Sequence, residues 1–321
     1  MSRPPVRKLV VGAADLEREL AIARATPAEN LAGAFGPDSM MWRIDKEAAI
    51  FLGAGRALLL QLAHPWIAAA IAEHSQTLAD PIGRFHRTFN VMFTIVFGTS
   101  EQALAAARRL HQRHAGISGR LTAALGPFAA CSRYEANDAA ALCWVHATLI
   151  DTALVAYELV CPPLAAAERE RYWAEGRRFA AFFGIQQEAC PPSWAEFSAG
   201  NARMWSSDVL SVGEQARKIA GAVLSGAGTW LPIPSWYRAL TARLLPTRLR
   251  GEFGLPYGES EQHKTERALA VLRRVYPRLP ARLRHVGPYH EACARLAGAM
   301  RPGVTTRLSN RLWIGQKSMA G

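Results

Sequence analysis

The stretch DPIGRFHRTFNVMFTIVFGT at residues 80–99 combines basic side chains with a long apolar run. Arg84, Arg87 and Thr88 are spaced i, i+3 and i+4, so a helix would carry them on one face, whereas His86 points elsewhere. Guanidinium groups are costly to bury without an anionic partner. If the segment is interior, we therefore expect acidic side chains, a bound anion or cofactor propionates opposite this face. The alternative is that these residues form only the exposed first turn of a helix.

Three histidines are candidate ligands. His111 and His114 lie at i and i+3 in RRLHQRHAGISG, and His146 lies in the apolar run ALCWVHATLID. Imidazole is the commonest metal ligand and a frequent axial ligand of haem. A histidine in an apolar helix is also often a core residue bonded to a backbone carbonyl. Because one axial histidine leaves no spacing signature, the pattern is compatible with haem and does not decide among the three.

Several other chemistries lack their motifs. The sequence contains no HExxH, no repeated Glu-x-x-His, no CxxCH and no CxxC, which argues against zinc, di-iron and covalently attached haem. It also lacks a GxSxG nucleophile elbow, a P-loop and the kinase motifs. The run GAGRALLLQ at 53–61 has no third glycine and no preceding strand, so we expect Gly53 and Gly55 to permit close helix packing instead.

Hydrophobic periodicity close to 3.6 residues and short loops predict an all-α protein. An apolar helix is expected over 46–63, with a break at His64-Pro65 because proline disfavours helix in the residue before it. Asp80 and Pro81 predict the N-cap and first residue of a helix that runs to Gly98. Further helices are expected over 99–117 and 139–159.

Length and composition favour one large domain. The chain has 321 residues, of which 50% are hydrophobic and 20% are charged, a globular composition. We expect a single helical domain with globin-like helix packing around a buried pocket. Its predicted parts are an N-terminal leader (1–40), a helical catalytic domain (41–260) and a basic helical C-terminal extension (261–321) packed on that domain. No signal peptide or convincing membrane-spanning segment is predicted, so a cytoplasmic location is expected.

The positive charge is concentrated at the C-terminus. The formal net charge is +12, and residues 238–321 contain sixteen lysines and arginines against five glutamates. Such a region suits peripheral contact with an anionic membrane surface or acidic partners, or is simply a solvated surface. No compact nucleic-acid-binding motif accompanies it, so no nucleic-acid partner is expected.

Four runs, in this order, carry a resemblance to a known family: GAGRALLLQLAHPWIAAAIAEHS, DPIGRFHRTFNVMFTIVFGT, HAGISG and YEANDAAALCWVHATLIDTALVAYE. Together with the later FGLPYG, they are similar to the catalytic domain shared by latex-clearing rubber oxygenases and mpaB-type oxygenases. The resemblance covers roughly residues 43–255. It implies an all-α oxidoreductase with a non-covalent haem b, O₂ and an apolar small-molecule substrate whose C=C bond is cleaved or oxygenated.

The resemblance also implies roles for individual residues. His114 best matches the proximal iron ligand, with His111 as the competing ligand and His146 as a second pocket residue. Arg84, Arg87 and Thr88 match an Arg-x-x-Lys-Thr face on the distal side, where they would act in catalysis, and Arg84 would also contact the cofactor. Arg87 takes the place of the lysine, and its planar fork demands more room.

Two departures bear on the substrate. The sequence shows neither the secretion signal expected of an enzyme that attacks extracellular rubber nor the membrane anchor of the fungal oxygenases. A small isoprenoid or other lipid-like alkene is therefore the expected substrate. The alternative is a non-catalytic helical protein that binds haem or a lipid.

Overall fold

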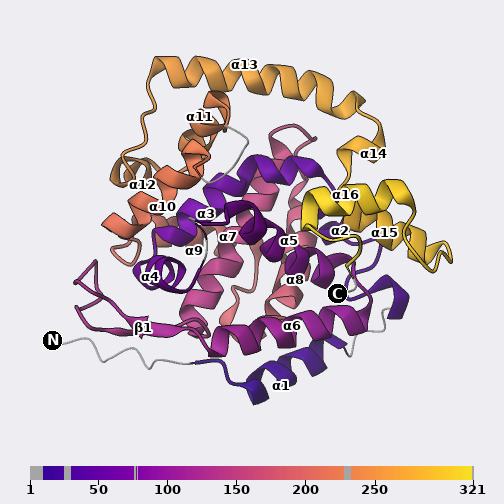
Figure 1. Ribbon diagram of the computed structural model, residues 1–321, viewed down its shortest axis with the longest axis horizontal. Helices are drawn as coiled ribbons and strands as arrows, with labels where there is room; N and C mark the ends of the chain where they lie inside the picture. The colour runs from indigo at the N-terminus through magenta and orange to yellow at the C-terminus, as the bar shows by residue number, and fades with distance from the viewer. Residues whose placement is uncertain (1–9, 25–29, 76, 78, 228–232, 320–321) are drawn as a thin grey trace.

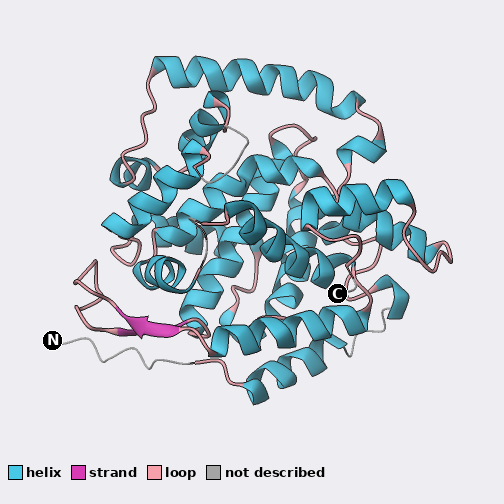
Figure 2. Cartoon of the chain, viewed as in Figure 1, coloured by secondary structure: helices cyan, strands magenta, loops and turns pink. Residues whose placement is uncertain are grey.

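The computed structural model describes residues 10–24, 30–75, 77, 79–227 and 233–319. In this part of the chain nearly all regular structure is helical, and the single short hairpin lies at one edge (Figures 1 and 2). The α-helices are α1 (Ala13–Arg24), α2 (Met40–Asp45), α3 (Ala54–Leu62), α4 (Pro65–His74), α5 (Pro81–Phe97), α6 (Ser100–Ala115), α7 (Ala139–Glu158), α8 (Ala166–Ala181), α9 (Trp194–Ser206), α10 (Glu214–Ser225), α11 (Ser235–Leu244), α12 (Thr247–Glu252), α13 (Glu259–Val275), α14 (Ala281–Arg284), α15 (Gly287–Leu296) and α16 (Val304–Ile314). The prediction of an all-α domain is confirmed.

Local signals set the ends of the central helices. Asp80 caps α5 by accepting a hydrogen bond from the Gly83 amide at 2.8 Å, and Pro81 is the first helical residue, as predicted. Thr99 and Gln102 form a capping box at the start of α6. Because only Gly98 and the capping residue separate the two helices, α5 and α6 pack side by side.

The predicted break at His64-Pro65 is present and sharp. The chain forms a 3₁₀ helix over Ala48–Gly53, continues as α3, and then turns by 103° into α4. A Cβ on Gly53 would lie 2.4 Å from Thr152 Cγ2, and one on Gly55 would lie 2.5 Å from Thr241 Oγ1. Both glycines therefore permit close packing of helices, as the sequence indicated.

The core is built around α7. This helix runs through the middle of the molecule and packs against the 3₁₀ helix, α2, α3 and α8 (Figure 1). The largest fully buried side chains are aromatic: Trp42, Trp173, Tyr134, Tyr172, Phe93 and Phe97. By length and composition α7 could cross a membrane, but half of its most apolar window is buried inside the protein, as in an ordinary core helix.

The later helices form an outer layer. Helix α13 lies at one edge of the molecule and packs on α11, while α15 and α16 pack against each other and against α5 (Figure 1). Tyr276 connects this layer to the body, because its hydroxyl donates to Glu47 Oε2 at 2.9 Å and accepts from the Ala49 amide at 3.0 Å. Arg284 Nε also lies 3.2 Å from Glu47 Oε2.

The sequence did not predict the hairpin. Strands β1 (Ser118–Arg120) and β2 (Arg133–Glu135) pair antiparallel, with Gly119 opposite Tyr134. Tyr134 is 1% exposed, and its hydroxyl lies 2.5 Å from Glu73 Oε2 of α4. This hydrogen bond fixes the hairpin between the end of α6 and the start of α7, where it closes one side of the site.

Candidate functional site

A cavity of about 620 Å³ lies among α4, α5, α6, α7 and the hairpin. Its volume is within the range of small-molecule and cofactor sites, roughly 300–1,000 Å³. Most of its wall is apolar and includes Ile67, Ile71, Val91, Met92, Leu142 and Val145. The charged side chains in the wall are mostly basic, so the cavity suits a ligand with a large apolar body and a negatively charged part.

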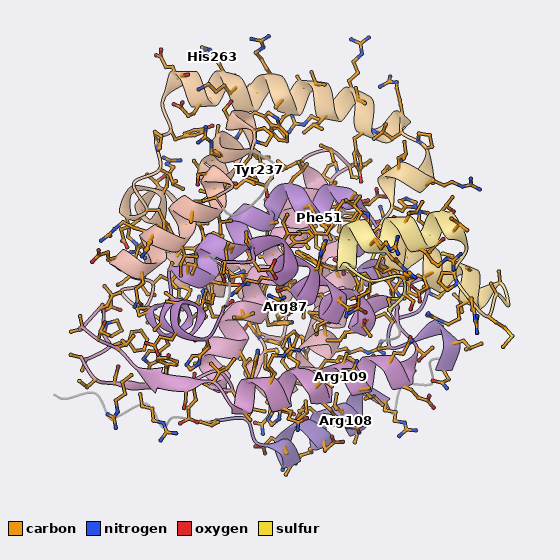
Figure 3. All side chains as sticks on the ribbon, in the orientation of Figure 1. Phe51, Arg87, Arg108, Arg109, Tyr237 and His263 are labelled. Carbon is orange, nitrogen blue, oxygen red and sulfur yellow. The ribbon has the colours of Figure 1, made fainter. Side chains whose placement is uncertain are left out.

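Helix α5 places all three predicted catalytic residues at this cavity. Arg84, Arg87 and Thr88 line it together, because their spacing puts them on one helix face. Arg87 Nη1 lies 3.1 Å from Asp80 Oδ2, so the residue that caps the helix also neutralises one guanidinium. In the orientation of Figure 3, Arg87 lies in the middle of the view, and its side chain is 47% exposed. The first turns of this apolar helix thus line a cavity at which Arg84 is partly buried, whereas Arg87 and Thr88 are exposed, so each of the two expectations holds for part of this face.

Arg84 differs from Arg87 in its partners. Its Nη1 donates to two hydroxyl groups, Ser75 Oγ at 2.5 Å and Thr77 Oγ1 at 2.6 Å, and it forms no ion pair within the described part of the chain. Burial and the neighbouring Arg87 lower the pKa of Arg84 to about 10. Since it still carries its charge at neutral pH, it is a cation in the cavity wall that has no acidic partner among the described residues and that suits a bound anion.

His114 lies on α6 and also faces the cavity. Burial lowers its pKa to about 4, with smaller contributions from Arg113 and His111, whereas a hydrogen bond with the Asn137 side chain acts in the opposite direction. The imidazole is therefore neutral at physiological pH. The Asn137 side chain is a hydrogen-bond partner of this ring, and the ring also borders the cavity, where a ligand reaches it. A neutral imidazole held by a second hydrogen bond is the typical state of a metal-binding histidine.

Asn137 connects the site to the N-terminal segment. Its Nδ2 donates to the His111 carbonyl at 3.2 Å, and its own carbonyl accepts from the Val11 amide at 2.9 Å. His111 Nε2 in turn lies 2.9 Å from the Val11 carbonyl. The last turn of α6, the loop before α7 and the start of the described chain are therefore joined around His114.

The structure does not bring His111 and His146 into the cavity. The His111 ring is directed to Val11, as described above. His146 is 2% exposed, and its Nε2 lies 2.7 Å from the Gly176 carbonyl. On α7 the cavity is lined by Ala141, Leu142, Val145 and Leu149, and His146 is not among its lining residues. The structure thus places His146, which was expected to be a pocket residue, in the core behind the cavity wall.

Some residues of the site were not predicted. Arg113 adds a third guanidinium to the wall, and Glu135 of β2 adds a carboxylate. His74, at the end of α4, also lines the cavity, with its Nε2 3.1 Å from the Ser118 carbonyl. Arg113 directly precedes His114, but α6 carries several exposed arginines, and Arg108 on its other side binds Glu17 of α1 (Figure 3). Spacing alone could not separate these arginines.

A second, smaller cavity of about 80 Å³ lies deeper in the core. Met92 and Leu149 line both cavities, so these two side chains form the wall between them. The polar side chains of the inner cavity include Asp45 and Tyr172 in an otherwise largely apolar wall. Asp45 makes no hydrogen bond or ion pair with a described residue, and burial, with a smaller contribution from Glu175, raises its pKa to about 7. Met92 and Leu149 therefore separate the main cavity from an inner cavity that holds the Asp45 carboxyl group.

Comparison with known proteins identifies the class. The family model described as "ER-bound oxygenase mpaB/B'/Rubber oxygenase, catalytic domain" matches residues 41–276. This range covers well over half of the 321 residues, so the chain belongs to this family of oxygenases. No curated protein and no solved structure matches the chain. The described residues contain no group of three or more His, Cys, Asp or Glu side chains that could hold a metal ion by themselves.

Proposed function

We propose that the protein is a haem b-dependent oxygenase that cleaves or oxygenates a C=C bond in an apolar, isoprenoid or lipid-like substrate. The observation that carries this proposal is the convergence of a neutral imidazole, His114, and an unpaired guanidinium, Arg84, on one apolar cavity. Membership of the oxygenase family makes the reaction class an oxidation; the cofactor and the substrate class are inferred from the site.

The residues present fit a haem. The ring system is flat and apolar and carries two carboxylates, and the cavity offers apolar walls together with three guanidiniums, of which Arg84 has no acidic partner among the described residues. His114 would ligate the iron, and its hydrogen bond to Asn137 would fix the orientation of the imidazole. Haem, when bound, supplies the activation of O₂.

The chain's own side chains would position the reactants. Arg84, held by two hydroxyl groups, presents a fixed hydrogen-bond donor on α5, with the Thr88 hydroxyl on the same helix face, and a donor that is already oriented stabilises developing negative charge at little cost. Arg87 is partly neutralised by Asp80, so we assign the main electrostatic role to Arg84. The apolar wall would hold a hydrocarbon chain and exclude water from it.

Two variants test cofactor binding. The wild-type protein, supplied with hemin and purified, is expected to show a Soret band, and the His114→Ala variant is expected to lose it. His111→Ala is the matched control and should keep the band, because the His111 ring is directed away from the cavity, to the Val11 carbonyl. A protein that stays colourless with hemin, or equal loss of the band in both variants, would refute the assignment of His114.

A third variant distinguishes an oxygenase from a protein that binds haem or a lipid without catalysis. We expect the haem-loaded protein to consume O₂ with a polyprenyl substrate, and Arg84→Met to retain the Soret band but lose most of this turnover. Removing one fixed electrostatic donor typically lowers a rate by about 10²–10³-fold. A wild-type protein that binds haem and substrate without consuming O₂ would be a binding protein, and the oxygenase proposal would be wrong.

A further inference from the structure

Helix α16 carries its apolar residues on the outside of the molecule. Val304, Leu308 and Leu312 are 64%, 57% and 64% exposed, and their spacing of four residues places them on one face. The opposite face is buried: Asn310 is 0% exposed, and the Trp313 ring stacks on Phe51. The exposed apolar stripe is therefore distinct from the buried residues that pack α16 against the rest of the protein.

The end of α15 and the connection before α16 carry two further exposed apolar residues. Met300 is 98% exposed and Leu296, at the end of α15, is 36% exposed. Figure 1 shows the α15–α16 connection projecting at one edge of the molecule. We call these five residues (Leu296, Met300, Val304, Leu308 and Leu312) the C-terminal apolar surface. Exposed apolar side chains that are grouped on the surface of a protein mark an interaction site.

The charges beside this surface have one sign. Residues 296–319 include Arg301, Arg307, Arg311 and Lys317 and contain no Asp or Glu. Arg307 and Arg311 are both exposed and lie one turn apart on α16, beside the apolar stripe. An apolar face flanked by arginines is typical of a helix that lies in the interface of an anionic membrane.

We propose that the C-terminal apolar surface docks on an anionic lipid bilayer. The leucines, valine and methionine would enter the boundary of the acyl chains, and the arginines would lie at the phosphates. The helix is already formed and fixed, because Glu291 accepts hydrogen bonds from Asn310 Nδ2 at 2.6 Å and from the Met319 amide at 3.1 Å. Docking would therefore not have to offset the cost of ordering a helix.

This surface lies outside the region matched by the family model, which ends at residue 276. It also adjoins the site, because α16 packs on α5 and the Leu312 carbonyl lies 3.0 Å from His86 Nε2. If the proposed function is correct, docking would bring the cavity-lining helix close to the phase in which an apolar substrate dissolves. Docking itself does not depend on haem or turnover.

Vesicle co-sedimentation of the full chain, without substrate, tests the proposal. We expect binding to phosphatidylcholine vesicles that contain about 30% phosphatidylglycerol, much weaker binding to pure phosphatidylcholine, and weakening as salt shortens the screening length. The double variant Leu308→Glu/Leu312→Glu should bind at least about tenfold more weakly, since a buried leucine contributes more than one factor of ten. Arg307→Gln and Arg311→Gln should each weaken binding about fivefold.

The matched control is Ile22→Glu. Ile22 is also an exposed apolar residue, 48% exposed, but it lies on α1, which carries three acidic and two basic residues. We expect this variant to bind vesicles like the wild type. All the substituted side chains are exposed, and thermal melting checks that each variant remains folded.

Three results would overturn the proposal. The first is absence of binding to the anionic vesicles, and the second is equal binding by the wild type and the leucine double variant. The third is a wild-type dimer in solution that the leucine double variant abolishes, because the surface would then be an interface between two copies of the chain.

Discussion

Replacing Asp45 with asparagine should make the protein more stable, and increasingly so as the pH rises. Asp45 lines the inner cavity without a hydrogen-bond partner in the described structure, and its pKa is raised from 3.8 to about 7. The folded state therefore keeps this proton up to about pH 7, whereas the unfolded chain releases it near pH 4. Between these values the folded state binds more protons, so the stability of the wild type falls as the pH rises.

The size of the effect follows from the shift. Each pKa unit corresponds to about 1.36 kcal/mol, so a shift of about three units removes about 4 kcal/mol of stability by pH 8. Water in the cavity would lower this upper value. Asparagine keeps the shape of the side chain and cannot ionise. Asp45→Asn should therefore match the wild type near pH 4 and exceed it by up to about 4 kcal/mol at pH 8.

Urea unfolding followed by circular dichroism at pH 4, 5, 6, 7 and 8 measures this difference as a shift in midpoint. Asp38→Asn is the control, since this residue is exposed and lies just before α2. It should leave the pH dependence of the midpoint as it is in the wild type. A stability difference between Asp45→Asn and the wild type that stays constant from pH 4 to pH 8 would refute the reasoning.

Three further changes test other parts of the fold. Arg56→Met should lower stability by about 3–5 kcal/mol in urea unfolding, because it leaves the buried Asp151 carboxylate, 2.6 Å from Arg56 Nη2, without its ion pair. His146→Ala should cost about 2–4 kcal/mol by the same measurement yet leave the Soret band of the hemin-loaded protein, since His146 is a core residue and not a ligand. Gly33→Ala should lower the melting temperature, because residue 33 has φ +73° and a Cβ there would lie 2.1 Å from the Gly98 carbonyl oxygen. Unchanged stability in the first or third variant, or a lost Soret band in the second, would contradict these assignments.

The sequence predicted the helices better than the residues that face the cavity. Asp80-Pro81 and His64-Pro65 marked a helix start and a helix break that the structure confirms, because capping and proline geometry act locally. The common face of Arg84 and Thr88 was also predictable from the helical repeat. The same repeat could not show which face of α7 borders the cavity, and His146 was expected there from the family resemblance.

The other features that the sequence did not predict depend on contacts between segments that are distant in the chain. The hairpin is fixed by Tyr134 and Glu73, which are 61 residues apart in the chain. Asn137 reaches His114 only because the loop before α7 folds back onto α6. Asp45 directly precedes a lysine, which is typical of a surface position, and its place at the inner cavity follows only from the packing of α2 against α7. Periodicity carries no information about such pairings.

The hydrogen bonds around Val11 show that the N-terminal segment supports the site, although it lies outside the region that the family model matches. Residues 41–276 contain all the described side chains that line the large cavity, yet the loop carrying Asn137 is hydrogen-bonded to Val11, which precedes residue 41. A chain shortened to residues 41–276 would keep the side chains at the cavity but lose the hydrogen bonds from Val11 to Asn137 and His111. All the lining residues of the cavity would then be present, but the segment around His114 would be held less firmly.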